Sequence, residues 1–179
     1  MFTGKRVYLR AFAPTDVPTF HRWRCDFEVM QYDQHGAVNV TDLSATQDWY
    51  DRISRDQSSF SYAIVEKETD RFIGTCALMR LDPKNHHSEC AIVIGEKDAW
   101  GRGYGKEALG LLLRYGFEEL NLHRIYLRVF SFNERAIRLY LRLGFVEEGR
   151  QREALYRFGQ WHDVIMMGLL RREFMALEQ

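Results

Sequence analysis

Apolar residues alternate with polar ones, or form short unbroken runs, in several stretches of the chain. Alternation is typical of β-strands with one buried face, whereas an unbroken apolar run suits a strand covered on both faces. The run at 90–94 is of the second kind and predicts a central strand, while Gly74 predicts a bulge or a close approach of backbones. The predicted strands, separated by polar turns, are 7–12, 61–66, 72–81, 90–94, 124–130, 145–157 and 161–170.

Apolar residues at helical spacing indicate helices between these strands. Three of them lie three positions apart at 17–23, just behind a proline that favours a helix start. Thr41 or Asp42 is expected to cap a second helix that runs to about residue 55. Residues 27–40 show no periodicity, so we expect a loop there.

Two more helices are predicted in the second half of the chain. One follows Gly105, and the other spans 133–143, where Glu134 and Arg138 form a favourable pair at i, i+4. Gly144 is placed to end the latter helix as a C-cap glycine.

The chain has 179 residues and neither a linker nor a repeat, which predicts a single α/β domain over 1–179. Its core should span about 5–172, followed by a short C-terminal tail. The net charge is zero and no long basic run occurs, so no nucleic-acid partner is expected. No run approaches the ~18 apolar residues of a membrane span. Three scattered cysteines favour a reducing compartment, and the expected location is the cytoplasm.

Charge is distributed unevenly along the chain. Residues 26–70 contain ten acids and three bases, whereas 100–172 is rich in arginine. A basic half suits a phosphorylated cofactor, and an acidic half suits a cationic substrate. The alternative is that both are solvated faces of unrelated helices.

A glycine-rich loop gives the strongest functional signal. The apolar strand ending at Gly95 is followed by residues 100–106, which carry three glycines and open an amphipathic helix. Unpaired N–H groups and the helix dipole suit a phosphate there, and Arg102 and Lys106 can add charge. A simple tight turn is the alternative. A P-loop is excluded because Glu107 follows Lys106, and a dinucleotide fold would place its loop near the start of the chain.

Several stretches occur together in a characteristic order: 8–12 with Asp16; 73–74; 88–92; 100–108; Asn133 with Ala136, Tyr140 and 144–145; and 149–163. In these stretches, which span nearly the whole chain, the sequence resembles the GNAT family of N-acetyltransferases, in particular the RimJ/RimL-like branch of ribosomal-protein N-terminal acetyltransferases. Its C-terminal half is also similar to spermidine N-acetyltransferases.

This resemblance implies the GNAT fold, a mixed and mostly antiparallel sheet of six to seven strands flanked by helices. The sheet should splay open at the strand before the glycine loop, where acetyl-CoA binds. The family usually has Gln or Arg three residues before Gly103, and Trp100 stands there instead. The implied cofactor-binding residues are Ile92, Val93 and Ile94, beside the pantetheine; Trp100, Gly101, Arg102, Gly103, Tyr104, Gly105 and Lys106, at the pyrophosphate; and Asn133.

The implied reaction is direct attack of an amine on the thioester within a ternary complex. Glu89 is the implied base, acting through water, or else a strand carboxylate paired with an arginine. Tyr140 is the implied acid for the departing thiolate, or else a core tyrosine. Asn133 either caps its helix or holds the coenzyme arm, and a backbone N–H near Ile92 or Val93 would meet the oxyanion.

No metal is expected, because His86 and His87 are adjacent and would point to opposite faces of a strand. Cys90 lies in the apolar run without an identifiable base, which argues against a nucleophile.

The sequence leaves the acceptor amine open: a protein N-terminus, a polyamine, an aminoglycoside or an amino sugar. Acceptor-binding loops are expected around 28–40 and at the turn after Arg157. One alternative is a non-catalytic acyl-CoA-binding protein. Another is a homodimer or higher homo-oligomer that uses 161–170 as an edge strand.

Overall fold

The computed structural model describes residues 2–33, 36–56 and 58–177. They form a seven-stranded sheet in the order β1-β2-β3-β4-β5-β7-β6. Neighbouring strands are antiparallel, except that β4 and β5 run parallel, so the predicted mixed sheet is confirmed. The strands are β1 (Val7–Ala11), β2 (Phe60–Glu66), β3 (Arg71–Asp82), β4 (His87–Ile94), β5 (Arg124–Phe130), β6 (Val146–Arg157) and β7 (Gln160–Leu170).

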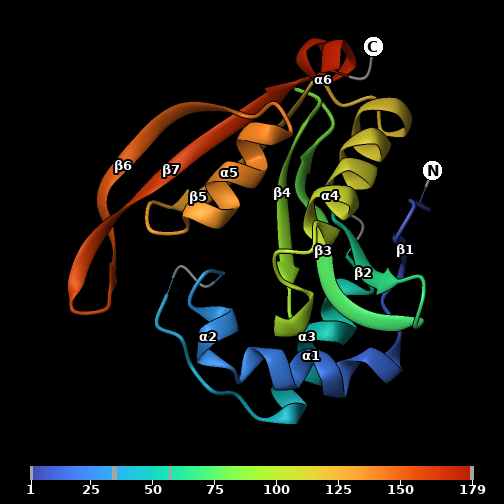
Figure 1. Cartoon of the computed structure of the whole chain (residues 1–179), viewed down its shortest axis with the longest axis vertical. Helices are drawn as coiled ribbons and strands as arrows, with labels where there is room; N and C mark the ends of the chain where they lie inside the picture. Colours follow the sequence, from blue (N-terminus) through green and yellow to red (C-terminus); the bar gives the residue numbers. More distant parts are fainter. Residues whose placement is uncertain (1, 34–35, 57, 178–179) are drawn as a thin grey trace.

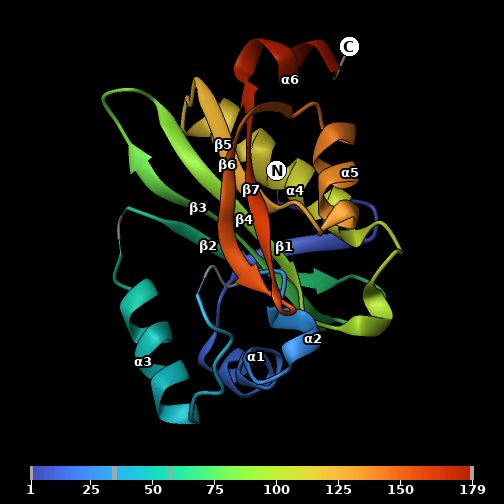
Figure 2. The ribbon, with the colours of Figure 1, turned by 90° about the vertical axis from the view of Figure 1, so that its left-hand side faces the viewer.

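Helices cover both faces of this sheet. Figures 1 and 2 show α1, α2 and α3 gathered at one end of the molecule. Helices α4 and α5 lie together on one face of the sheet. The α-helices are α1 (Val17–Arg24), α2 (Phe27–Met30), α3 (Leu43–Ile53), α4 (Tyr104–Arg114), α5 (Glu134–Arg142) and α6 (Arg171–Leu177). Short 3₁₀ turns occupy Pro14–Asp16 and Lys97–Ala99, and a π-helical turn, Tyr115–Glu119, extends α4.

Two apolar clusters lie on opposite faces of the sheet. Neighbouring residues of β2 belong to different clusters: Ile64 packs with α4, and Ala63 packs with α1. Such alternation follows from the two-residue period of a strand. Within the described part of the chain, no helix has the length and apolar character needed to cross a membrane.

The predicted helix starts are confirmed. Val17, Phe20 and Trp23 are buried on one face of α1. Asp42, rather than Thr41, caps α3, because its carboxylate accepts a hydrogen bond from the Ala45 N–H at 2.8 Å.

Helix α5 also has the predicted ends. Asn133 caps it by accepting a hydrogen bond from the Ala136 N–H at 3.2 Å. Arg138 lies 3.0 Å from Glu134, and Gly144 follows the helix with φ +89°. A positive φ favours glycine, which explains why the helix ends there.

Gly74 lies where backbones approach closely. The register between β2 and β3 shifts beside it, and a Cβ at this position would overlap the carbonyl oxygen of Val93. Both features predicted for this glycine, the bulge and the close approach, are therefore present.

Three expectations are wrong. The region 27–40 is not all loop, because Asp26 accepts a hydrogen bond from the Glu28 N–H and so caps the short helix α2. The expected C-terminal tail forms α6, whose Phe174 packs against Phe117. Strand β7 is not an edge strand, since it lies between β5 and β6, and the largely exposed β6 forms that edge of the sheet.

The sheet opens between β4 and β5, as expected from the resemblance. The two strands pair at only three positions, from His87 with Arg124 to Glu89 with Tyr126. Beyond these positions β5 stays paired with β7 along its whole length, and β4 and β5 diverge (Figure 1).

Replacing Gly144 with alanine should destabilise the fold by more than about 1 kcal/mol, because a Cβ at positive φ is strained. It would also overlap Leu177 Cδ1. Gly110→Ala in α4 is the matched control, since its Cβ would meet nothing within 4 Å. That control should stabilise the protein by up to about 1 kcal/mol. Urea unfolding measures both changes, and equal effects would contradict the cap.

Candidate active site

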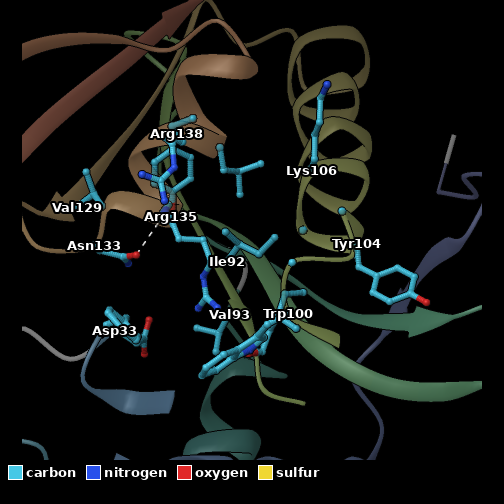
Figure 3. Close-up of a pocket in the computed structure, with 18 of the residues that line it drawn as sticks. Asp33, Ile92, Val93, Trp100, Tyr104, Lys106, Val129, Asn133, Arg135 and Arg138 are labelled. Carbon is cyan, nitrogen blue, oxygen red and sulfur yellow. Dashed lines mark hydrogen bonds between the residues drawn. The ribbon is translucent and has the colours of Figure 1, made fainter. Parts of the chain in front are cut away.

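A cavity of about 310 Å³ lies where β4 and β5 diverge. It is bounded by β4, the loop before α4, the first turn of α4, β5 and α5, and the segment after α2 closes one side (Figure 3). The residues around it are Val29, Tyr32, Asp33, Ile92, Val93, Ile94, Ala99, Trp100, Gly101, Gly103, Tyr104, Gly105, Lys106, Arg128, Val129, Asn133, Arg135, Ala136, Arg138, Leu139, Tyr140 and Arg142. Apart from Glu89 and Arg102, every site residue predicted above is among them.

The glycine loop ends in an uncapped helix. Gly101 and Gly103 have φ of +73° and +84°, which explains the residue type at both positions. Gly103 is the N-cap of α4, and no side chain of the described residues caps the helix there. The N–H groups of the first turn are therefore available to an anion, and the helix dipole favours one.

Contacts behind the loop fix its shape. The Arg6 guanidinium donates a hydrogen bond to the carbonyl oxygen of Arg102 at 2.6 Å. The Tyr104 hydroxyl donates to the buried Glu66, and its ring points away from the cavity (Figure 3). The Arg102 guanidinium also turns outward, to 3.8 Å from Glu66. Arg102 and Tyr104 can thus offer the cavity backbone groups, while their side chains hold the loop.

The open edge of β4 forms one wall of the cavity. From Cys90 to Ile94 the described strands offer no partner on the β5 side, so backbone groups along this edge can pair with a ligand. Trp100 donates its indole N–H to the carbonyl oxygen of Ile94 at 2.7 Å. Arg135 stacks on the Trp100 ring at 4.2 Å, and this pair joins α5 to the loop before α4.

Positive charge dominates the cavity. Figure 3 shows Lys106 on α4 and Arg138 on α5, on opposing walls. The basic residues that line the cavity are Lys106, Arg128, Arg135, Arg138 and Arg142, and the one carboxylate among the described lining residues is Asp33. This balance suits a ligand with several phosphate charges.

Tyr140 is 7% exposed and lines the cavity from α5. Burial raises the pKa of its hydroxyl, with smaller contributions from Cys90 and Asp33. Nothing in the described residues hydrogen-bonds to this hydroxyl, although its ring packs against Phe145. A buried hydroxyl normally has a partner, so a bound ligand is a natural one.

Glu89 lies behind the cavity wall. Its carboxylate accepts a hydrogen bond from Arg128 Nε at 2.9 Å, and its other oxygen lies 3.1 Å from Arg80 Nη1. It is 5% exposed and does not line the cavity, whereas Arg128 does. The surroundings of Glu89 are therefore those of a strand carboxylate paired with arginine, the second of its two expected roles. Its role as a base stays a prediction.

Asn133 satisfies the cap of α5 with its carbonyl oxygen while lining the cavity (Figure 3). Its amide nitrogen is therefore available to a ligand, so the two alternatives for this residue are compatible.

His86, His87 and Cys90 are not among the residues that line the cavity. In the part of the chain that the structure covers, no group of three or more His, Cys, Asp or Glu side chains is placed to hold a metal. His87 lies 3.5 Å from Asp82 at the far end of β4, and His86 is in a turn. Burial raises the pKa of the Cys90 thiol, which disfavours the thiolate.

The sequence reasoning did not single out Arg128 and Arg135, whereas Tyr32 and Asp33 lie in the segment 28–40 that was expected to bind the acceptor. A signal existed for Arg135, which lies one helical turn before Arg138. Arg138, which the sequence analysis only paired with Glu134, borders the cavity together with Arg135. No local signal showed which residues of 28–40 line the cavity, because this segment reaches the cavity only through tertiary packing.

Comparison with known proteins agrees with this geometry. Residues 6–146 match the acetyltransferase (GNAT) domain family. The chain belongs to the GNAT acetyltransferase family. The uncharacterized N-acetyltransferase p20 of Bacillus licheniformis is 34% identical over 173 residues, which cover 95% of this chain and 96% of the relative.

Spermidine N(1)-acetyltransferase of Escherichia coli (strain K12) is 29% identical over 180 residues, 98% of this GNAT chain and 92% of the relative. The crystal structure of spermidine N-acetyltransferase from Vibrio cholerae in complex with CoA and spermine has a TM-score of 0.88 at 26% identity. It covers 96% of this chain and 99% of that one. The predicted GNAT fold, acetyltransferase class and use of acetyl-CoA are confirmed.

Gly105→Ala should weaken the binding of CoA by about tenfold or more, ~1.4 kcal/mol. A Cβ at this position would lie 3.7 Å from Ile94 and Leu139, without strain, but inside the slot between β4 and α5. Gly110→Ala on the same helix is the matched control. Isothermal titration measures both, and unchanged affinity for the Gly105 variant would place the pyrophosphate elsewhere.

Proposed function

We propose that this GNAT protein transfers the acetyl group of acetyl-CoA to a primary amine by direct attack within a ternary complex. The uncapped N-terminus of α4, facing the open edge of β4, is the observation that carries this proposal. A phosphate site and a strand edge that can pair with an amide-containing arm lie side by side there.

The residues around the cavity divide into two groups. Backbone N–H groups from Arg102 to Lys106 hold the pyrophosphate, and the edge of β4 at Ile92, Val93 and Ile94 pairs with pantetheine. Trp100 supports this edge through its bond to the Ile94 carbonyl. The basic side chains of α4 and α5 neutralise the remaining phosphate charge.

The chemistry uses Tyr140 as the acid. The amine attacks as its neutral form, a backbone N–H near Ile92 or Val93 stabilises the oxyanion, and Tyr140 protonates the departing thiolate. Burial raises the pKa of Tyr140, so it stays protonated throughout the neutral range. Glu89 is the base implied by the family resemblance and would act through water.

A polyamine is a second candidate for the acceptor. It is favoured by the likeness to the Vibrio cholerae enzyme in complex with spermine. The acidic segment 26–70 supports a polyamine acceptor less than the sequence implied. Asp48, Asp51 and Asp56 border a separate surface hollow, and Asp33 is the described acid at the cavity. A comparison of spermidine with an N-terminal peptide as acceptors distinguishes the two substrate classes.

Location and assembly follow as further parts of the proposal. The three cysteines are unpaired, which supports the reducing cytoplasm. A homodimer would use β6, the exposed edge strand, rather than β7. Light scattering tests the assembly directly.

Tyr140→Phe should lower kcat by about 10²-fold and leave the affinity for CoA unchanged, because it removes only the proton donor. Turnover is measured on an amine panel, and binding by titration with acetyl-CoA, CoA and NADH. Wild-type protein should bind both coenzyme A species and not NADH. Binding without acetylation of any amine would favour the non-catalytic alternative, and unchanged kcat in the variant would remove Tyr140 from the reaction.

A further inference from the structure

We propose that Asp33 is the catalytic residue that accepts the proton from the acceptor amine. This inference rests on the proposed function and assigns the role of base to Asp33 in place of Glu89. It comes from the placement of Asp33 in the cavity rather than from a sequence motif.

Asp33 is placed to meet an amine. It lines the cavity that Tyr140 also lines, on the side closed by the segment after α2 (Figure 3). Its side chain is exposed to solvent there, and its carboxylate has no hydrogen-bond or ion-pair partner among the described residues. An ammonium or amine group entering this side of the cavity would find its natural partner in this carboxylate.

Arg157 fixes the backbone on both sides of Asp33. Its guanidinium, 7% exposed, donates one hydrogen bond to the carbonyl oxygen of Gln31 at 3.1 Å. It donates a second to the carbonyl oxygen of Gly36 at 2.8 Å. The end of β6 therefore holds the segment that carries Asp33 against the cavity.

Glu89 is less suited to the same step. Its carboxylate oxygens face Arg128 and Arg80, and Arg128 stands between it and the cavity. An incoming amine would have to displace or bypass a guanidinium. Asp33 meets the amine directly.

The proton balance closes with Asp33 and Tyr140 together. The neutral amine forms a bond from nitrogen to the carbonyl carbon of the thioester, and the nitrogen then loses one proton to Asp33. The carbon–sulfur bond breaks, and the sulfur takes the electron pair and the proton of Tyr140. Water returns the Asp33 proton to the Tyr140 phenolate, which restores both groups.

The surroundings of Asp33 suit a base that works near neutral pH. The protein around the cavity mouth partly desolvates its carboxyl and raises the pKa, although the side chain remains accessible, and Arg24 opposes the shift. Among the residues that the structure describes, the other charged or titratable groups around this part of the cavity are Tyr32 beside it, Arg128 on β5, Arg135 and Tyr140 on α5, and Arg157 on β6. A raised pKa brings the carboxylate closer to the basicity that proton transfer needs.

The test is a pH profile of kcat/KM, calculated on the concentration of unprotonated amine, for the amine that wild type acetylates fastest. The wild-type value should fall tenfold per pH unit below the pKa of Asp33, which lies above the ordinary ~3.9 of aspartate. Asp33→Asn should lower kcat/KM at pH 7 by about 10²- to 10⁴-fold and abolish that fall. Asp33→Glu keeps the carboxyl and should retain the fall at a reduced rate.

Asp48→Asn is the matched control, because Asp48 borders the separate hollow on α3. It should match wild type. Glu89→Gln should retain the fall of the profile. Titration with CoA should show unchanged affinity for Asp33→Asn, which separates loss of the base from loss of the fold.

The Asp33 role is overturned, with the proposed function intact, if Asp33→Asn keeps the profile and the rate of wild type. It is likewise overturned if Glu89→Gln, and not the Asp33 variant, abolishes the fall. Wild-type protein that binds CoA and acetylates no amine would instead overturn the proposed function, and the Asp33 role with it.

Discussion

Between β4 and β5 the sheet loses its ladder of backbone hydrogen bonds after Glu89, and the rest of the structure is arranged around this opening. Backbone polar groups in the middle of a sheet must find partners, because leaving them buried and unpaired is costly. Trp100 satisfies the carbonyl of Ile94, and the rest of the edge faces the cavity. The opening therefore leaves backbone N–H and C=O groups that need hydrogen-bond partners, and a ligand with amide groups can supply them.

Positive charge is concentrated at this opening. Arginines of α5 and β5 line the same cavity, and two contacts reduce the repulsion between their charges. Glu89 pairs with Arg128 from behind, and Arg135 stacks on the Trp100 ring. A ligand with several negative charges would relieve the repulsion further. The clustered arginines therefore lower the stability of the ligand-free protein and raise its affinity for a negatively charged ligand.

The long β6–β7 hairpin ties the two halves of the molecule together. It builds the outer part of the sheet beside β5, and at its far end Arg157 holds the segment after α2. Aromatic contacts strengthen the same junction, since Phe158 packs against Phe27 and Phe132. The side of the cavity next to α2 thus depends on residues from distant parts of the chain.

Features with a local cause were determined by the sequence itself. The glycine loop needs positive φ at Gly101 and Gly103, and Asn133 and Gly144 mark the ends of α5, so neighbouring residues alone specify them. Tertiary structure alone decided that β7 is interior, which of the two surroundings expected for Glu89 is present, and which residues of 28–40 line the cavity. The physical reason is distance along the chain: the contact of Arg157 with Gln31 joins residues 126 positions apart. Such a pair is fixed by strand order and packing, which no local pattern of polar and apolar residues records.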